Sequence, residues 1–153
     1  MTQALLATLL SCGVFLVVSE LQVNLVAEAG PGVSAPYLPA GVRLIAAAVF
    51  GVAGCVGVAA ASLLVASQTF PTAGGGTLLM IALVSGFAPL LALMAFRRAY
   101  GIGEDLRDLS FRGLLVLAAL QSTISPLAHQ AVFYVSGAAP ASVANLLVMV
   151  AGD

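Results

Sequence analysis

Long apolar runs separated by short polar stretches dominate the pattern of the chain. They cover residues about 4–27, 41–67, 77–96 and 113–136. A helix crosses the hydrocarbon core of a bilayer with about 20 residues, so each run is long enough to span a membrane. The pattern therefore predicts an all-α fold, a polytopic bundle of transmembrane helices.

The second run, residues 41–67, is longer than one span requires. Gly51, Gly54 and Gly57 lie in its middle, where glycine weakens a helix or lets helices pack closely. The run forms either one tilted helix or two short segments broken near Gly51, and the glycines favour the broken form. We then expect about five to six membrane segments, some short or kinked, in one integral membrane domain covering 1–153.

The last apolar segment, residues 141–153, is shorter than the others. As a helix it rises about 20 Å, against a hydrocarbon core of about 30 Å. Either this segment is a half-span or the chain has been cut within a helix, and we favour a cut or an atypical truncated gene. In the third run, Pro89 is expected to kink the helix.

Composition supports the membrane assignment. Of 153 residues, 61% are hydrophobic and only 7% are charged, whereas a soluble domain has roughly 25% charged residues. The lipid bilayer is therefore the expected partner. The sequence contains no basic patch with interleaved aromatic residues, so nucleic-acid binding is not expected.

The arginines predict the orientation. Four of the five lie in the polar loop 97–112, which the positive-inside rule makes cytoplasmic. If the run 41–67 is broken, the N-terminus is inside and Arg43 lies near the outer interface. If it is one helix, the N-terminus is outside and Arg43 is an ordinary cytoplasmic anchor.

Arg43 is the first candidate for chemistry, because an apolar run follows it and its guanidinium cannot lose its charge. It must reach the interface, find a carboxylate or face a wet cavity. A second candidate is the helix face shared by Gln121, Ser125 and His129, spaced four residues apart. This stretch is too polar to face lipid all round, so we expect it to point into the bundle.

One interpretation gathers the polar residues into a ligand-binding cavity, with His129 adding pH sensitivity near neutrality. The candidate ligand-binding residues are Glu20, Arg43, Gln121, His129 and Asn145. The alternative is that Glu20 pairs with Arg43 and the amides only join helices. Interhelical hydrogen bonds of this kind average only about 0.6 kcal/mol, so joining helices does not require so many.

Catalysis, cofactors and metals are not expected. The chain lacks a Walker loop, an H-E-x-x-H motif and a nucleophile elbow, and its single histidine has no diagnostically spaced carboxylate. Cys12 and Cys55 lie inside apolar runs without metal-ligand spacing, as small membrane-embedded hydrophobes do.

The order of several short motifs resembles a known family. Leu38-Pro39-Ala40-Gly41 opens an apolar helix ending at Phe50-Gly51, a small-residue segment follows, and a later span ends in Arg97-Arg98. Leu106–Leu109 reads Leu-Arg-Asp-Leu, and a late helix carries the step Gly152-Asp153. Together they resemble the membrane-associated sensor (MASE-type) family first defined in bacterial histidine kinases and diguanylate cyclases.

The resemblance implies a multi-pass sensory input module in a bacterial inner membrane. Such domains feed a cytoplasmic output domain, and this sequence includes none, so a signalling partner in trans or an excised input domain is expected. A homo-oligomer is left open. The chain also departs from the family pattern at Arg43, where an apolar residue is usual.

Two other functions fit the residues. One is a substrate-capture component of a small-molecule transporter of the vitamin-uptake kind. The other is a helix-packing subunit that binds no ligand.

Overall fold

The computed structural model describes residues 1–25, 28–30, 33–34, 37–103, 106–139 and 141–153. Five helices account for most of them: α1 (Thr2–Leu25), α2 (Pro39–Thr69), α3 (Gly75–Tyr100), α4 (Phe111–Ser136) and α5 (Val143–Gly152). Two short antiparallel strands, β1 (Glu28–Gly30) and β2 (Val33–Ser34), lie between α1 and α2. The predicted all-α bundle is confirmed, and the small hairpin is an addition that the hydrophobic pattern did not predict.

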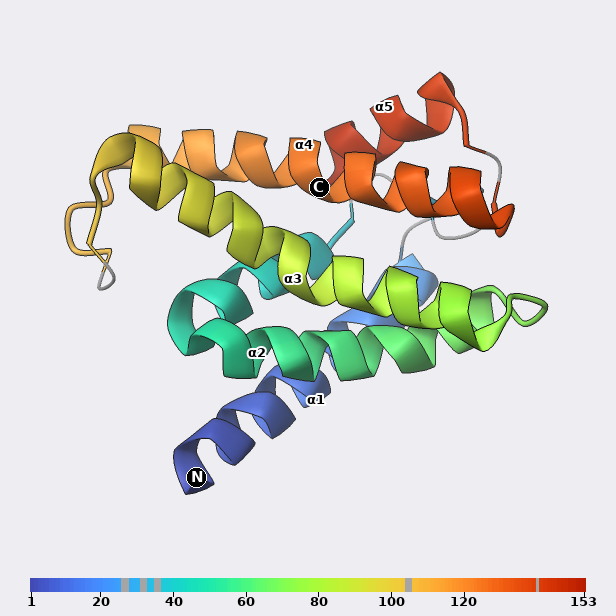
Figure 1. The fold of residues 1–153 in the computed structure, drawn as a ribbon, viewed down its shortest axis with the longest axis horizontal. Coiled ribbons are helices and arrows are strands. Elements are labelled where there is room, and N and C mark those ends of the chain that lie inside the picture. Colours follow the sequence, from blue (N-terminus) through green and yellow to red (C-terminus); the bar gives the residue numbers. More distant parts are fainter. Residues whose placement is uncertain (26–27, 31–32, 35–36, 104–105, 140) are drawn as a thin grey trace.

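Helix α2 changes direction at Gly51, so the predicted break is confirmed. Gly51 has φ 57° and ψ −134°, a backbone conformation that glycine tolerates and that is costly for residues with a Cβ atom. The segment before the break, residues 39–50, rises only about 18 Å as a helix, which is too short to cross a bilayer. Figure 1 shows this segment folded back along the longer segment 52–69.

Local signals fix the ends of α3 and α4. Helix α3 ends at Tyr100, and the left-handed backbone of Gly101 (φ 65°) closes the last turn. Helix α4 begins after Ser110, whose hydroxyl caps the first turn by accepting a backbone N–H. Pro89 and Pro126 stay inside their helices. The polar connection is therefore shorter than the predicted loop 97–112.

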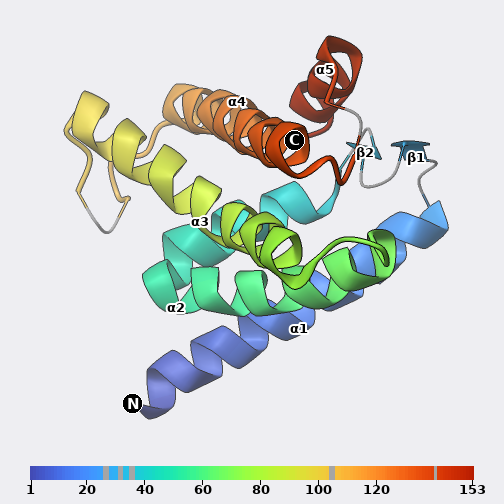
Figure 2. The ribbon, with the colours of Figure 1, turned by 45° about the vertical axis from the view of Figure 1, so that its right-hand side comes forward.

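The helices pack in chain order: α1 on α2, α2 on α3, α3 on α4, and α5 against α4 (Figures 1 and 2). Glycines allow the close contacts. A Cβ atom at Gly57 would collide with the backbone carbonyl of Thr8 in α1, and one at Gly86 would lie 2.5 Å from the backbone oxygen of Cys55. Small residues at helix interfaces serve the same purpose in other membrane proteins.

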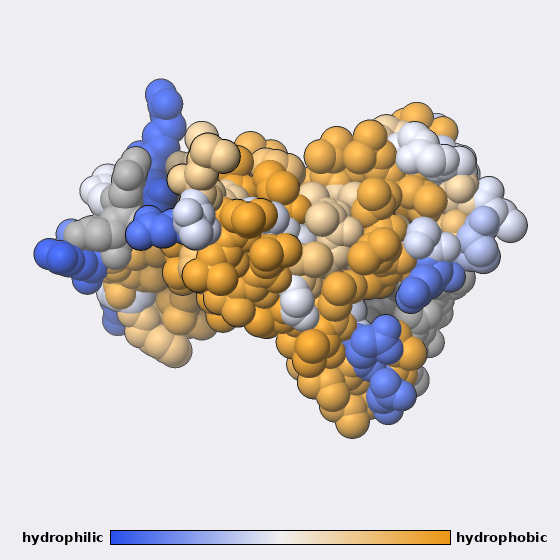
Figure 3. Space-filling view, turned by 90° about the horizontal axis from the view of Figure 1, so that it is seen from below, coloured by the Kyte–Doolittle hydropathy of each residue, from blue (hydrophilic) through white to orange (hydrophobic). Residues whose placement is uncertain are grey.

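The outer surface is largely apolar. In Figure 3 hydrophobic residues fill the middle of the visible face, and hydrophilic residues gather towards its ends. Large side chains such as Leu10, Val52, Leu91 and Leu115 point outwards. Helices α1 to α4 are each long and apolar enough to cross a membrane. The chain is a multi-pass membrane protein.

Both ends of the bundle can be followed in Figure 1. The N-terminus, the break in α2 and the end of α3 lie at one end of the bundle. The turn between α2 and α3 and the start of α5 lie at the other. This is the arrangement expected when the run 41–67 is broken. The N-terminus then lies on the same side as residues 97–112, which contain four arginines (the arginine-rich loop).

Candidate functional site

Arg43 lies at the centre of the polar interior. Its side chain is 2% exposed, and that of its partner Asp153 is 4% exposed. Arg43 Nη2 donates to Asp153 Oδ2 over 2.9 Å, and Nη1 donates to Ser125 Oγ over 3.0 Å. The Tyr37 ring centroid lies 5.1 Å from the guanidinium carbon, in cation–π range. The carboxylate offsets a charge that would otherwise be costly inside a bilayer.

Two helix ends meet at this ion pair. Helix α2 begins at Pro39, α5 ends at Gly152, and the backbone N–H of Tyr37 donates to the Gly152 carbonyl over 2.9 Å. Arg43 bonds to Ser125, which is close to the middle of α4, and Figure 1 shows the C-terminus beside the middle of that helix. Helix ends at this depth are tolerated in membrane proteins where they are buried in protein or line a cavity.

The depth of Arg43 corrects one expectation. Arg43 was predicted to lie near the outer interface, yet it contacts the midpoint of a membrane-spanning helix. The reason is that the chain enters the bundle before α2 begins. Tyr37 is half-buried and its N–H donates to the Gly152 carbonyl, and the Leu38 N–H donates to Gln22 Oε1 over 2.8 Å. The first turn of α2 therefore lies beside the middle of α4.

His129 joins the site from the next turn of α4. Its Nδ1 lies 2.9 Å from the Ser125 carbonyl oxygen, and its Nε2 lies 3.1 Å from Ser85 Oγ in α3. Because a carbonyl only accepts, a neutral ring here carries its proton on Nδ1 and accepts a hydrogen bond from the Ser85 hydroxyl at Nε2. The arrangement ties α3 to α4 at the depth of the ion pair.

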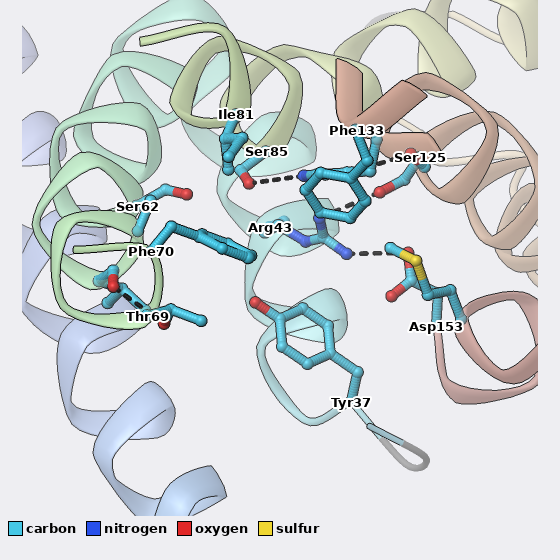
Figure 4. Close-up of a pocket in the computed structure, with 14 residues that line it drawn as sticks. Tyr37, Arg43, Ser62, Thr69, Phe70, Ile81, Ser85, Ser125, Phe133 and Asp153 are labelled. Atoms are coloured by element: carbon cyan, nitrogen blue, oxygen red, sulfur yellow. Dashed lines mark hydrogen bonds and ion pairs between the residues drawn. The ribbon is translucent and has the colours of Figure 1, made fainter. Parts of the chain in front are cut away.

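A cavity opens beside these residues, between α2, α3, α4 and α5 (Figure 4). About 70 Å³ is open to the centre of a water molecule, and one water needs roughly 10–15 Å³ of such space. Its polar wall contains the ion pair, Tyr37 and the Ser85–His129 bond. The rest of the lining is mainly apolar and also includes two hydroxyl residues of α2: Val65, Ala66, Phe70, Ile81, Phe133 and Met149, with Ser62 and Thr69. The cavity can therefore hold several waters or a small molecule with a polar and an apolar part.

The cavity leads from mid-depth towards one end of the bundle. Thr69 and Phe70, at the end of α2, line it together with Arg43. Those two residues adjoin the turn between α2 and α3, which Figure 1 places opposite the end of α3. The cavity thus extends away from the arginine-rich loop.

Glu20 is not part of this site, which corrects the predicted Glu20–Arg43 pair. Its side chain is exposed, and its backbone carbonyl accepts a bond from Asn24 Nδ2 over 2.7 Å. Arg43 instead points to Ser125 in α4. Helices α1 and α4 lie on opposite sides of the bundle, with α2 and α3 between them (Figures 1 and 2). Glu20 is therefore separated from the direction in which Arg43 points.

Gln121 and Asn145 fall outside the residues that line the cavity. Gln121 is 2% exposed and lies one turn before Ser125 in α4. Within the described part of the chain, neither its amide nitrogen nor its amide oxygen has a hydrogen-bond partner. Asn145 is half-buried in α5, one turn before the cavity residue Met149. Arg43 and His129 are the two predicted residues that the structure brings together at the cavity.

Sequence reasoning missed Asp153, Tyr37 and Ser85 as site residues. A signal existed for Asp153, because a carboxylate at the end of an apolar segment needs a cation just as Arg43 needs an anion. Tyr37 and Ser85 carried no comparable signal. An aromatic residue before a helix and a serine inside one are ordinary in membrane proteins.

The site offers hydrogen-bonding and charged groups. Among the described residues, no three His, Cys, Asp or Glu side chains lie close enough together to hold a metal ion. Arg43 Nε is buried and has no partner among the same residues. Buried donors of this kind are rare in proteins unless water or a ligand satisfies them. The chemistry available is therefore hydrogen bonding and charge pairing with a small molecule.

Comparison with models of known protein families, with curated proteins and with solved structures finds no match for this chain.

Proposed function

We propose that the protein is a membrane-embedded sensory module that binds a small molecule in the cavity beside Arg43 and responds by repacking its helices. The observation that carries this proposal is the buried Arg43–Asp153 pair, which joins two helix ends on the wall of a cavity. A ligand that competes for either charge changes the contact holding α5 in place.

Helix α5 is joined to the start of α2 by groups at the cavity. Its end is fixed by the ion pair and by the bond from the Tyr37 N–H to the Gly152 carbonyl. A ligand shifts a two-state equilibrium only by its difference in affinity for the two states. Because the charged groups of α2 and α5 line the cavity, a ligand there contacts the groups that would move.

The resemblance to membrane-associated sensors supports the same proposal. Its Pro-x-Gly motif opens α2, its following glycine coincides with the break at Gly51, and its Gly-Asp step supplies Asp153. In this proposal the protein resides in a bacterial inner membrane, with the arginine-rich loop in the cytoplasm and an output protein acting in trans. The cavity then extends towards the outer side.

A transport role is the second candidate, and the two helix ends at mid-depth favour it. Many transporters bind substrate near the bilayer midplane, where broken helices end. A substrate-capture component would therefore have similar architecture. Accumulation of a labelled substrate in vesicles, dependent on a partner protein, would favour transport over sensing.

A fusion to a reporter kinase tests the sensory proposal. Cells carrying the fusion are exposed to fractions of small metabolites until one changes the output, and Arg43→Ala is compared with wild type. We expect the variant to stay in the membrane and to lose the response. Arg98→Ala is the matched control, because it removes the same charge at an exposed position. An unchanged response in Arg43→Ala would refute ligand sensing at this cavity.

A further inference from the structure

We propose that the ligand of this cavity is a small zwitterion with an apolar side group, the chemistry of an α-amino acid. The proposal rests on the proposed ligand-binding function and specifies what binds. The ligand carboxylate would pair with Arg43, its ammonium group with Asp153, and its side group would lie against the apolar wall. It would insert into the ion pair without leaving either charge unpaired.

The charged groups that line the cavity favour a ligand with one positive and one negative charge. With His129 counted as neutral, the side-chain charges that line the cavity are one guanidinium and one carboxylate, and they cancel. A simple anion that took Arg43 would leave Asp153 buried and unpaired, and a simple amine would do the same to Arg43. An uncompensated buried charge is strongly unfavourable. A ligand with both charges avoids that cost.

The guanidinium has a vacant donor for a carboxylate. Nε and Nη2 form one edge of the planar donor fork, which matches the two oxygens of a carboxylate. Asp153 Oδ2 occupies only Nη2, and Nε has no partner among the described residues. Nη1 is held by Ser125. A ligand carboxylate can therefore use the whole edge, while Asp153 turns to the ammonium group.

The remaining wall selects the side group. Phe70, Ile81 and Phe133 line the cavity as one apolar cluster, in which the ring centroids of Phe70 and Phe133 lie 5.6 Å apart. Figure 4 shows Phe70 and Asp153 on opposite sides of Arg43, with Tyr37 below. Space for several waters suits a side group of one to four carbons better than a large aromatic one.

Binding to the full-length protein in lipid nanodiscs tests the proposal. The probes are L-alanine, L-valine and L-leucine. Each is compared with the carboxylate that lacks its amino group and with the amine that lacks its carboxylate; for valine these are 3-methylbutanoate and 2-methylpropylamine. Titration calorimetry should give saturable binding for at least one amino acid, and its two single-charge analogues should bind at least tenfold more weakly.

Substituting either Arg43 or Asp153 should change which charge a ligand must carry to bind. Asp153→Asn leaves Arg43 without a carboxylate, so 3-methylbutanoate should gain at least tenfold relative to valine. Arg43→Gln leaves Asp153 without a cation, so the amine should gain instead. Glu20→Gln is the matched control, because it neutralises an exposed carboxylate away from the cavity, and its ligand preference should equal that of wild type. A loss of folding alone would weaken the binding of valine and of both its analogues together. It would not change which of the three binds most tightly.

Two results would overturn the inference: no saturable binding by any of the three amino acids, or analogues that bind as tightly as the zwitterion. Either result leaves the sensory proposal standing if the reporter fusion still responds through Arg43. Loss of the response in the reporter's Arg43→Ala variant, together with amino-acid binding that exchanges its charge preference, supports both.

Discussion

Removing one partner of the Arg43–Asp153 pair should strongly destabilise the protein. The two side chains are 2% and 4% exposed, and their atoms are 2.9 Å apart. Breaking a buried pair by deleting one partner costs about 3–5 kcal/mol, because the other charge is left buried. We therefore expect Arg43→Met and Asp153→Leu each to lower the free energy of unfolding by about that amount.

The double variant should be much closer to wild type than either single variant. Replacing both partners of a buried ion pair by apolar residues is often neutral or stabilising. The single losses should therefore fail to add, with a coupling free energy of about 3 kcal/mol or more. The backbone bond between Tyr37 and Gly152 is present in every variant and cancels in the comparison, so the coupling reports the side-chain pair.

The thiol of Cys55 provides the assay. Cys55 is 1% exposed at the interface between α2 and α3, whereas Cys12 is only half-buried. In a Cys12→Ala background, labelling of Cys55 by a maleimide during a denaturant titration in micelles reports unfolding. Strictly additive losses in the double variant would refute the reasoning. So would single variants within about 1 kcal/mol of the parent, because the pair would then not be buried as described.

Other predictions follow from the same structure. Gly57→Ala should destabilise the protein by roughly 1–3 kcal/mol, because its methyl group would collide with the facing carbonyl of α1, while Gly13→Ala, with nothing near its Cβ, should not; the Cys55 assay compares them. Gly51→Ala should cost about 1–3 kcal/mol through backbone strain alone, since the space around its Cβ is open; a larger loss would indicate a packing role. The cysteine introduced by Ser85→Cys should react with a small water-soluble thiol reagent applied from the side of the turn between α2 and α3. If the reagent does not modify this cysteine from that side, the cavity is not open there. Glu20→Gln should change the free energy of unfolding by less than about 0.5 kcal/mol, because the side chain is exposed.

Most of the helical architecture could be predicted from sequence. Apolar runs of sufficient length fix membrane helices almost independently of tertiary contacts, because backbone groups in lipid must bond within the helix. The break in α2 was also predictable. Glycine at position 51 permits a backbone conformation that other residues avoid, and the run was too long for one span. The hairpin formed by β1 and β2 was not predictable, because its few residues carry no alternating pattern.

The partner of Arg43 was less accessible to sequence reasoning. Outside the polar loop and the hairpin, two carboxylates could reach it, Glu20 and Asp153. Charge compensation alone does not distinguish them. The distinction depends on which side of the bundle Arg43 faces, and that follows from packing α2 between α1 and α4. Local sequence does not encode such long-range geometry.

One physical cause explains both why Arg43 lies deeper than the sequence predicted and where the site is. A chain that begins a helix inside a membrane leaves backbone and charged groups away from water, and these need partners there. Here the start of α2 and the end of α5 supply partners to each other through Arg43, Asp153, Tyr37 and Gly152. Two helix ends with side chains of both signs do not pack as tightly as two continuous helices, so a cavity remains beside them. A sequence that places an arginine just after a Pro-x-Gly helix start and an acid at the end of a short apolar helix therefore predicts more than an ion pair: it predicts a polar cavity near the middle of the membrane.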